Sequence, residues 1–136
     1  MIAPDSSVVI AALAPWHEAH GPARDELVGA EVRLPAHVAF ETTSALSRMP
    51  EGRRVAPAVV LSALEAGFRE PWISMDGRSL RRCLRRAVER GVRGGALSDA
   101  LIGATIAHHG GTVVSADRRA LATYRAMEVE VRLIEA

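Results

Sequence analysis

Four acidic residues spread along the chain have the type and placement that metal-dependent chemistry requires. Asp5 follows a short apolar run, Glu41 lies in a stretch with few other charges, Asp99 precedes an apolar segment, and Asp117 follows Val113-Val114-Ser115. Carboxylates that converge on one crevice repel one another and are pushed towards protonation unless a cation joins them. Hard carboxylate oxygens, without Cys or clustered His ligands, favour Mg²⁺, with Mn²⁺ as a substitute.

Taken singly, each acid also has a purely structural explanation. Asp5 and Asp117 could cap the helices expected directly after them, and Asp99 could favour the positive N-terminal end of its own helix. Glu41 could be a solvated helix residue, and Asp76 is best explained as a helix cap. The joint appearance of the four acids is what favours a shared site, because two of them follow expected strands.

The alternation of apolar runs with turn residues predicts strands that alternate with helices. We expect strands at 1–3, 32–34, 72–75, 112–115 and 129–134, and helices at 8–13, 17–28, 36–49, 58–67, 78–93, 99–109 and 118–127, with Ser98 as the cap before 99. This order predicts an α/β domain with a mainly parallel sheet of about five short strands. Ligands of such sheets bind beyond the carboxyl ends of the strands, where Asp5 and Asp117 should meet.

Size and composition limit the classes of protein that the chain can belong to. Its 136 residues suit one domain over 1–136. Apolar stretches end well before the ~20 residues of a membrane span, so we expect no membrane contact and a cytoplasmic location. All 17 basic residues are Arg, and the absence of Lys excludes a Walker-A phosphate loop and Schiff-base catalysis.

One segment carries an uneven distribution of charge, although the net charge of the chain is only +1. Between 78 and 93, seven Arg residues accompany a single acid, Glu89. The spacing predicts a helix whose core-facing stripe consists of four residues, Leu80, Leu84, Ala87 and Val88. Possible RNA or partner contacts on its outer face are Arg81, Arg82, Arg85 and Arg86, with a solvated helix face as the alternative.

These motifs, in this order, resemble the PIN-domain ribonucleases of the VapC toxin type. The resemblance spans nearly the whole chain and is carried by four segments: Asp5-Ser6-Ser7-Val8-Val9, Phe40-Glu41-Thr42-Thr43-Ser44-Ala45-Leu46, Ser98-Asp99-Ala100-Leu101-Ile102 and Val113-Val114-Ser115-Ala116-Asp117. It implies a three-layer PIN-like sandwich in which the four acids bind the metal, with Ser6 and Ser115 as supporting groups. It further implies RNA hydrolysis by metal-activated water, neutralisation by a VapB-type antitoxin, and a homodimer.

Two other functions remain open at this point. A PIN-like domain that binds RNA or protein without catalysis would share the fold. A phosphatase that forms an aspartyl-phosphate on Asp5 would usually need a second Asp two residues later, where this chain has Ser7. Pro4 departs from an ordinary strand because proline cannot donate to a sheet ladder, so the first strand should end or bulge there.

Overall fold

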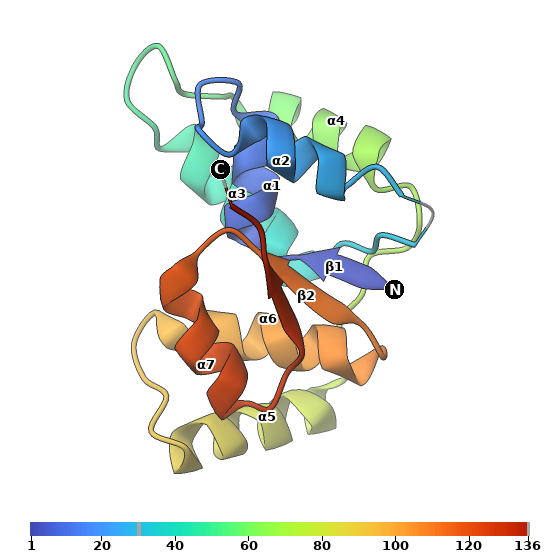
Figure 1. The fold of residues 1–136 in the computed structure, drawn as a ribbon, viewed down its shortest axis with the longest axis vertical. Helices are drawn as coiled ribbons and strands as arrows, with labels where there is room; N and C mark the ends of the chain where they lie inside the picture. The colour runs from blue at the N-terminus through green and yellow to red at the C-terminus, as the bar shows by residue number, and fades with distance from the viewer. Residues whose placement is uncertain (30, 136) are drawn as a thin grey trace.

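A parallel sheet of three strands forms the centre of the computed structural model, which describes residues 1–29 and 31–135. The strands are β1 (Ile2–Pro4), β2 (Thr112–Ser115) and β3 (Val131–Leu133), in the order β1-β2-β3. Ala3 is in register with Val113, and Val114 with Arg132. β2, from late in the chain, therefore occupies the middle and pairs with the strand near the N-terminus (Figure 1).

The expectation of about five strands was wrong, because two of the expected segments form only single bridges. Val32 bridges to Ile2, and Ile73 bridges to Pro35, both in parallel orientation. The Ile73 N–H donates to Leu34 O at 2.9 Å, so these segments continue the sheet beyond β1. They cannot extend into ladders, since Pro35 has no N–H to donate and a helix follows it at once.

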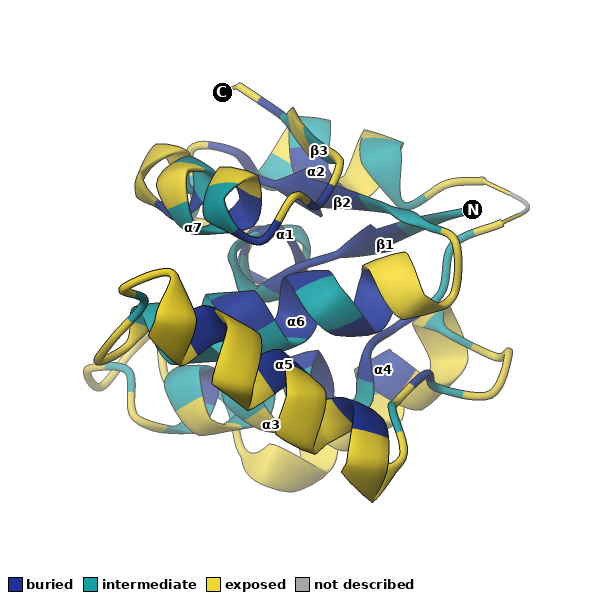
Figure 2. Cartoon of the chain, turned by 90° about the horizontal axis from the view of Figure 1, so that it is seen from below, coloured by how far each residue is buried: buried dark blue, intermediate teal, exposed yellow. Residues whose placement is uncertain are grey.

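Helices cover both faces of the sheet, as the alternating pattern predicts. Their bounds are α1 (Ser6–Leu13), α2 (His20–Glu26), α3 (Ala36–Ser47), α4 (Pro57–Gly67), α5 (Gly77–Glu89), α6 (Ala96–His108), a 3-10 turn η1 (Arg118–Ala120) and α7 (Leu121–Ala126). Successive strand residues point to opposite faces. Val114 accordingly packs with α1 and α2, whereas Val113 packs with residues of α3 to α7 in the larger core. Figure 2 shows β1 and β2 mostly buried among the helices, with β3 more exposed at the edge of the sheet.

The Arg-rich helix α5 buries a different face from the one that hydrophobicity predicts. Its buried residues are Ser79, Cys83 and Ala87, so only Ala87 of the expected stripe faces the core. The other three, Leu80, Leu84 and Val88, are 38%, 55% and 63% exposed. The reason is close packing against α6, where Cys83 Sγ lies 3.8 Å from Ala100 O. Small side chains allow that approach, and the larger ones are left on the surface.

Two of the N-terminal caps that the sequence predicts, at Asp5 and Asp76, are present, and a third, at Ser98, is not. Asp5 caps α1, and Asp76 caps α5 by accepting a 2.8 Å hydrogen bond from the Ser79 N–H. The residue before α6 is Gly95, so Ser98 lies inside the first turn and is not the cap that the sequence predicted. Within the described ranges, no helix has the length and apolar character that crossing a membrane requires.

Candidate active site

Asp5 occupies the junction between β1 and α1, where the sequence predicts it, but its side chain is deeply buried. It is only 3% exposed. Oδ1 accepts hydrogen bonds from Ser7 Oγ at 2.5 Å and Ser7 N at 3.1 Å, and Oδ2 accepts one from the Tyr124 hydroxyl at 2.8 Å. Burial raises the pKa of Asp5 above its ordinary value, although these donors act in the opposite direction.

Glu41 faces the start of α1 from the middle of α3. Its Oε1 accepts a 2.5 Å hydrogen bond from Ser6 Oγ, which gives Ser6 the supporting position that the resemblance implies. Its Oε2 lies 3.6 Å from His37 Nε2, one helical turn earlier on α3. The same His37 nitrogen lies 3.1 Å from Ser98 Oγ on α6. Glu41 is therefore held between α1 and α6 rather than free on a solvated face.

The charges of the other three acids act on Asp99, which lies in the first turn of α6. Its pKa is raised to about 6, first by partial burial and then by the charges of Asp5, Glu41 and Asp117. Like charges raise a carboxyl pKa in this way only when they share a neighbourhood. The four acids, from four separate segments, therefore share one region of the molecule.

Asp117 lies just beyond β2 and caps the 3-10 turn that follows, accepting a 3.0 Å hydrogen bond from the Arg119 N–H. The loop is supported by Ser115, which is fully buried and whose Oγ accepts from the Asp117 N–H at 3.1 Å. Ser7 Oγ accepts from the Ala116 N–H at 2.8 Å. One serine therefore bonds to both the Asp5 carboxylate and the loop before Asp117, linking the ends of β1 and β2.

The described acids do not form a ready-made cage for a metal ion. In the part of the chain that the structure describes, no three His, Cys, Asp or Glu side chains stand close enough together to hold a metal ion. Mg²⁺ commonly keeps several waters and binds one or two protein carboxylates directly. A loosely spaced set of like charges, with one pKa raised by the others, fits that donor chemistry. The ligand roles of the four acids stay predictions.

Three residues in this region escaped the sequence analysis: Ser7, His37 and Tyr124. His37 had a usable signal, since it lies four positions before Glu41 and so on the same side of a helix. Tyr124 had none, because its partner Asp5 is 119 positions away. The Tyr124 ring packs against Gly103 of α6, where an added Cβ would lie 2.9 Å from its Cδ1.

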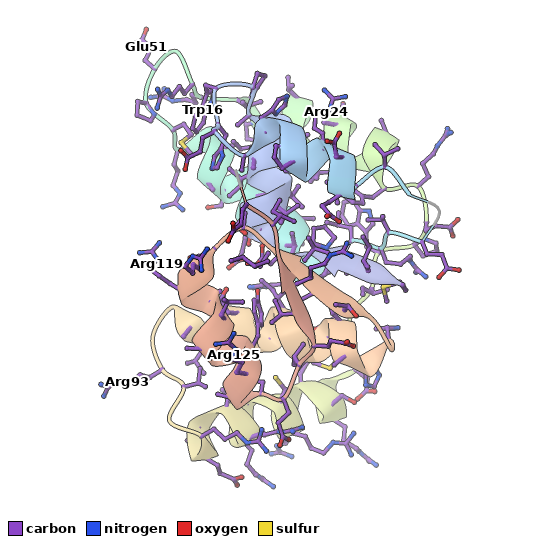
Figure 3. All side chains as sticks on the ribbon, in the orientation of Figure 1. Trp16, Arg24, Glu51, Arg93, Arg119 and Arg125 are labelled. Atoms are coloured by element: carbon purple, nitrogen blue, oxygen red, sulfur yellow. The ribbon has the colours of Figure 1, made fainter. Side chains whose placement is uncertain are left out.

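The possible RNA or partner contacts on α5 differ in what they touch. Arg86 is paired with Glu128, at 2.6 Å between Nη2 and Oε2. Arg82 donates only to Ser79 Oγ, at 3.4 Å, and no ion pair of Arg81 or Arg85 occurs within the described residues. All four are exposed. Figure 3 shows two other arginines, Arg93 beyond α5 and Arg119 before α7, reaching outwards on one side of the molecule.

Comparisons with known proteins agree with this architecture. The family model described as PIN domain matches residues 2–126. Ribonuclease VapC40 of Mycobacterium tuberculosis is 40% identical over 134 residues, covering 98% of this chain and 99% of that protein. The crystal structure of FitAcB from Neisseria gonorrhoeae superposes with a TM-score of 0.71 at 23% identity, over 96% of both chains. VapC20 of M. tuberculosis, described as a sarcin–ricin loop cleaving toxin, has a TM-score of 0.70 at 20% identity, over 90% of this chain and 94% of that one.

Proposed function

The chain belongs to the PIN-domain family, and on that basis we propose that it is a Mg²⁺-dependent endoribonuclease of the VapC toxin type. The observation that carries the proposal is the electrostatic coupling of Asp99 to Asp5, Glu41 and Asp117. Four carboxylates from distant segments are costly to gather unless a cation joins them. The relative VapC40, which bears the name ribonuclease, supports RNA as the substrate.

In the proposed site the acids bind the metal ion, and neighbouring hydroxyl groups orient the acids. Asp5, Glu41, Asp99 and Asp117 would hold Mg²⁺, or Mn²⁺ in its place, some of them through water. A bound Mg²⁺ lowers the pKa of its water and offsets negative charge on the phosphate that is cleaved. Ser6 orients Glu41, and Tyr124 orients Asp5, through the hydrogen bonds described above. These bonds fix the carboxylates before RNA binds, which reduces the reorganisation that the reaction needs.

A cleavage assay with matched variants tests the proposal. The purified protein, freed of any partner, should cut single-stranded RNA with Mg²⁺, stop with chelator and recover with added Mn²⁺. Asp99→Asn should lower the rate by at least about 100-fold, the upper range for loss of a residue that only supports a metal ligand. Asp76→Asn is the control, since it makes the same chemical change at the cap of α5, where Asn serves nearly as well.

Each rival function predicts a different result in this assay. If Asp99→Asn cleaves RNA at the parental rate, Asp99 has no part in the mechanism. Metal-dependent release of phosphate from a small phosphate ester, with RNA left intact, would favour the phosphatase. RNA that is bound but stays uncut under all metal conditions would favour a non-catalytic PIN-like domain.

We also propose that the chain is neutralised by a cognate VapB-type antitoxin and forms a homodimer. Contiguous apolar patches on a protein surface commonly mark interaction sites. The exposed stripe of Leu80, Leu84 and Val88 on α5 offers such a surface for a protein partner. Leu84→Glu should weaken whichever association uses it, as measured by sedimentation with and without a coexpressed antitoxin. Unchanged association in both samples would exclude the stripe from either interface.

A further inference from the structure

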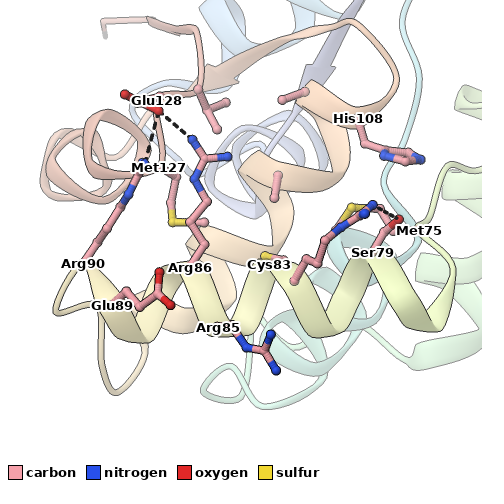
Figure 4. Close-up of a pocket in the computed structure, with 14 residues that line it drawn as sticks. Met75, Ser79, Cys83, Arg85, Arg86, Glu89, Arg90, His108, Met127 and Glu128 are labelled. Carbon is pink, nitrogen blue, oxygen red and sulfur yellow. Dashed lines mark hydrogen bonds and ion pairs between the residues drawn. The ribbon is translucent and has the colours of Figure 1, made fainter.

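A groove with basic walls lies away from the four acids, between α5, the second half of α6 and the turn after α7. Its volume is about 760 Å³. Its charged lining consists of Arg82, Arg85, Arg86 and Glu89 of α5, Arg90 at the end of that helix, and Glu128 of the turn. Figure 4 shows Arg86 and Arg90 reaching towards Glu128. We propose that this groove binds the phosphate groups of the RNA strand beside the cleaved bond. The identity of the ligand rests on the proposed ribonuclease function, whereas the binding of phosphate rests on the groove itself.

Three of these arginines, Arg82, Arg86 and Arg90, form a row at intervals of four residues. Side chains at this spacing lie on one side of a helix, and their origins are about 6 Å apart along the axis at 1.5 Å per residue. That separation is comparable with the distance between consecutive phosphates of a nucleic-acid strand. Guanidinium groups bind phosphate oxygens through two parallel hydrogen bonds. The row therefore has the spacing and the chemistry to follow a phosphodiester backbone.

Glu128 holds two members of the row in place. Its Oε2 accepts from Arg86 Nη2 at 2.6 Å and from Arg90 Nη2 at 3.3 Å, and these partners keep the Glu128 pKa below its ordinary value. Arg90 Nη1 also donates to Ala126 O at 2.6 Å. Two guanidiniums thus share one carboxylate, which leaves a positive excess. Since each guanidinium has five N–H donors, most of them remain available to a ligand.

The way in which α7 ends sets the position of Glu128. Its φ is 58°, the one positive value among the non-glycine residues that the structure describes. This is the left-handed residue that ends α7 in a Schellman motif, in which the Glu128 N–H donates to Arg125 O at 3.0 Å and the Val129 N–H donates to Tyr124 O at 2.9 Å. Here it places the Glu128 carboxylate between Arg86 and Arg90.

Arg82 completes the row without an acidic partner. It is exposed, and within residues 1–29 and 31–135 its side chain makes one hydrogen bond, of 3.4 Å to Ser79 Oγ, and no ion pair. His108 lines the opposite wall, from the end of α6. A bound phosphate should therefore interact most strongly with Arg82, because no carboxylate of the described residues competes for its guanidinium group.

The row of arginines, rather than the rest of the lining, favours RNA over a protein ligand, since Met75, Met127 and Val129 also line the groove. An amphipathic helix needs an apolar stripe, and the exposed stripe of α5 (Leu80, Leu84 and Val88) lies outside the lining of this groove. A second copy of the chain docked through the same row would bring arginine against arginine. A phosphodiester backbone needs neither apolar contact nor an acidic side chain. Phosphate therefore matches the row better than either protein alternative.

The groove lies too far along α6 to reach the cleaved phosphate itself. Ala104 and Ala107, which line it, follow Asp99 by five and eight residues, or about 8 and 12 Å along the axis. The row should therefore contact flanking nucleotides. Loss of such contacts weakens binding of the substrate and the transition state equally, so it should raise KM and leave kcat unchanged.

The test measures RNA binding without cleavage. A labelled single-stranded RNA is titrated in chelator with the wild-type chain and with R82A/R86A, across a series of salt concentrations. Each phosphate contact to a single strand contributes about 0.7 to the slope of log K against log salt concentration. We expect the double variant to lower that slope by about 1.4 and to bind several-fold more weakly at low salt. The control is R24A/R69A, two exposed arginines outside the groove, with Arg24 at the opposite end of the molecule from α5 (Figure 3).

Two results would overturn the inference, and neither depends on catalysis. If R82A/R86A matches the wild type in slope and affinity while both give the same circular dichroism spectrum, the row does not bind RNA. If R24A/R69A lowers the slope of log K against log salt concentration as much as R82A/R86A does, RNA is attracted by the overall surface charge. The groove is then not a specific binding site. A failure of the cleavage assay with the binding result intact would instead count against the proposed ribonuclease.

Discussion

The Tyr124 hydroxyl donates a 2.8 Å hydrogen bond to Asp5 Oδ2, joining α7 to the end of β1. Both residues are buried. Burial, followed by the charge of Asp5, raises the pKa of Tyr124 above its ordinary range, so the hydroxyl stays protonated and continues to donate. A residue near the C-terminus therefore fixes the orientation of the first acid of the site.

Removal of this hydroxyl should destabilise the fold and impair the site. Tyr124→Phe keeps the ring but leaves a buried carboxylate oxygen without its donor, which costs about 1–3 kcal/mol. Urea unfolding followed by circular dichroism measures the loss. RNA cleavage with Mg²⁺ should fall as well, because Asp5 loses its fixed orientation. An unchanged free energy of unfolding would show that this bond contributes nothing to stability.

Gly103 should tolerate no larger residue, although it lies in the interior of a helix. Alanine usually stabilises such positions by about 1 kcal/mol, but at Gly103 a Cβ would lie 2.9 Å from Tyr124 Cδ1. Overpacking of this kind costs roughly 1–3 kcal/mol, so we expect Gly103→Ala to lower the midpoint of thermal unfolding. Gly67→Ala in α4 is the control, since nothing lies within 4 Å of its added Cβ. Equal midpoints for the two variants would contradict the close approach.

The contribution of Asp99 to the stability of the metal-free protein should fall as pH rises towards neutrality. Asp99 has a folded-state pKa of about 6, above the value of about 3.9 for an unfolded chain. The folded state therefore binds more protons between these values, and the stability present below pH ~4 is lost as pH rises through ~6. Asp99→Asn removes this dependence, so its advantage over wild type should grow from pH 4 to pH 7. Melting curves in chelator measure it, and a constant difference would contradict the raised pKa.

Addition of Mg²⁺ should reverse that loss of stability. A ligand that binds only the folded state stabilises it by RT ln(1 + [L]/Kd), about 2.7 kcal/mol at 100 times Kd. Wild type at pH 7.5 should therefore melt at a higher temperature with Mg²⁺ or Mn²⁺ than in chelator. Asp99→Asn should show a much smaller shift, whereas Asp76→Asn should respond like wild type. Identical shifts in all three proteins would place the ion elsewhere.

The fold class and the positions of Asp5 and Asp117 after their strands were predictable because they depend on local patterns. Strand–helix alternation and the capping positions of Asp5 and Asp117 can be read from neighbouring residues, and parallel strands put their carboxyl ends together. The Asp5 and Asp117 caps were confirmed. The role of each acid towards a metal stays a prediction, since it concerns a ligand that binds between segments.

The errors arose where tertiary packing overrides a local preference. Hydrophobicity assigned Leu80, Leu84 and Val88 of α5 to the core, but α6 approaches too closely for large side chains and selects Ser79 and Cys83 instead. The segments at 32–34 and 72–75 have strand-like composition, yet each forms one bridge. No local pattern reports how near a neighbouring helix lies, or that Tyr124 reaches Asp5.

The pairing of β1 with β2 also sets the order in which this polypeptide can mature on a ribosome. Ile2–Pro4 is made first, but its partner Thr112–Ser115 is translated only after Asp5, Glu41 and Asp99 already exist. Pairing between such distant segments is intrinsically slow. A nascent chain that stops before residue 112 carries three of the four acids and no central strand to align them. The proposed site should therefore assemble only in translation products that extend beyond residue 117.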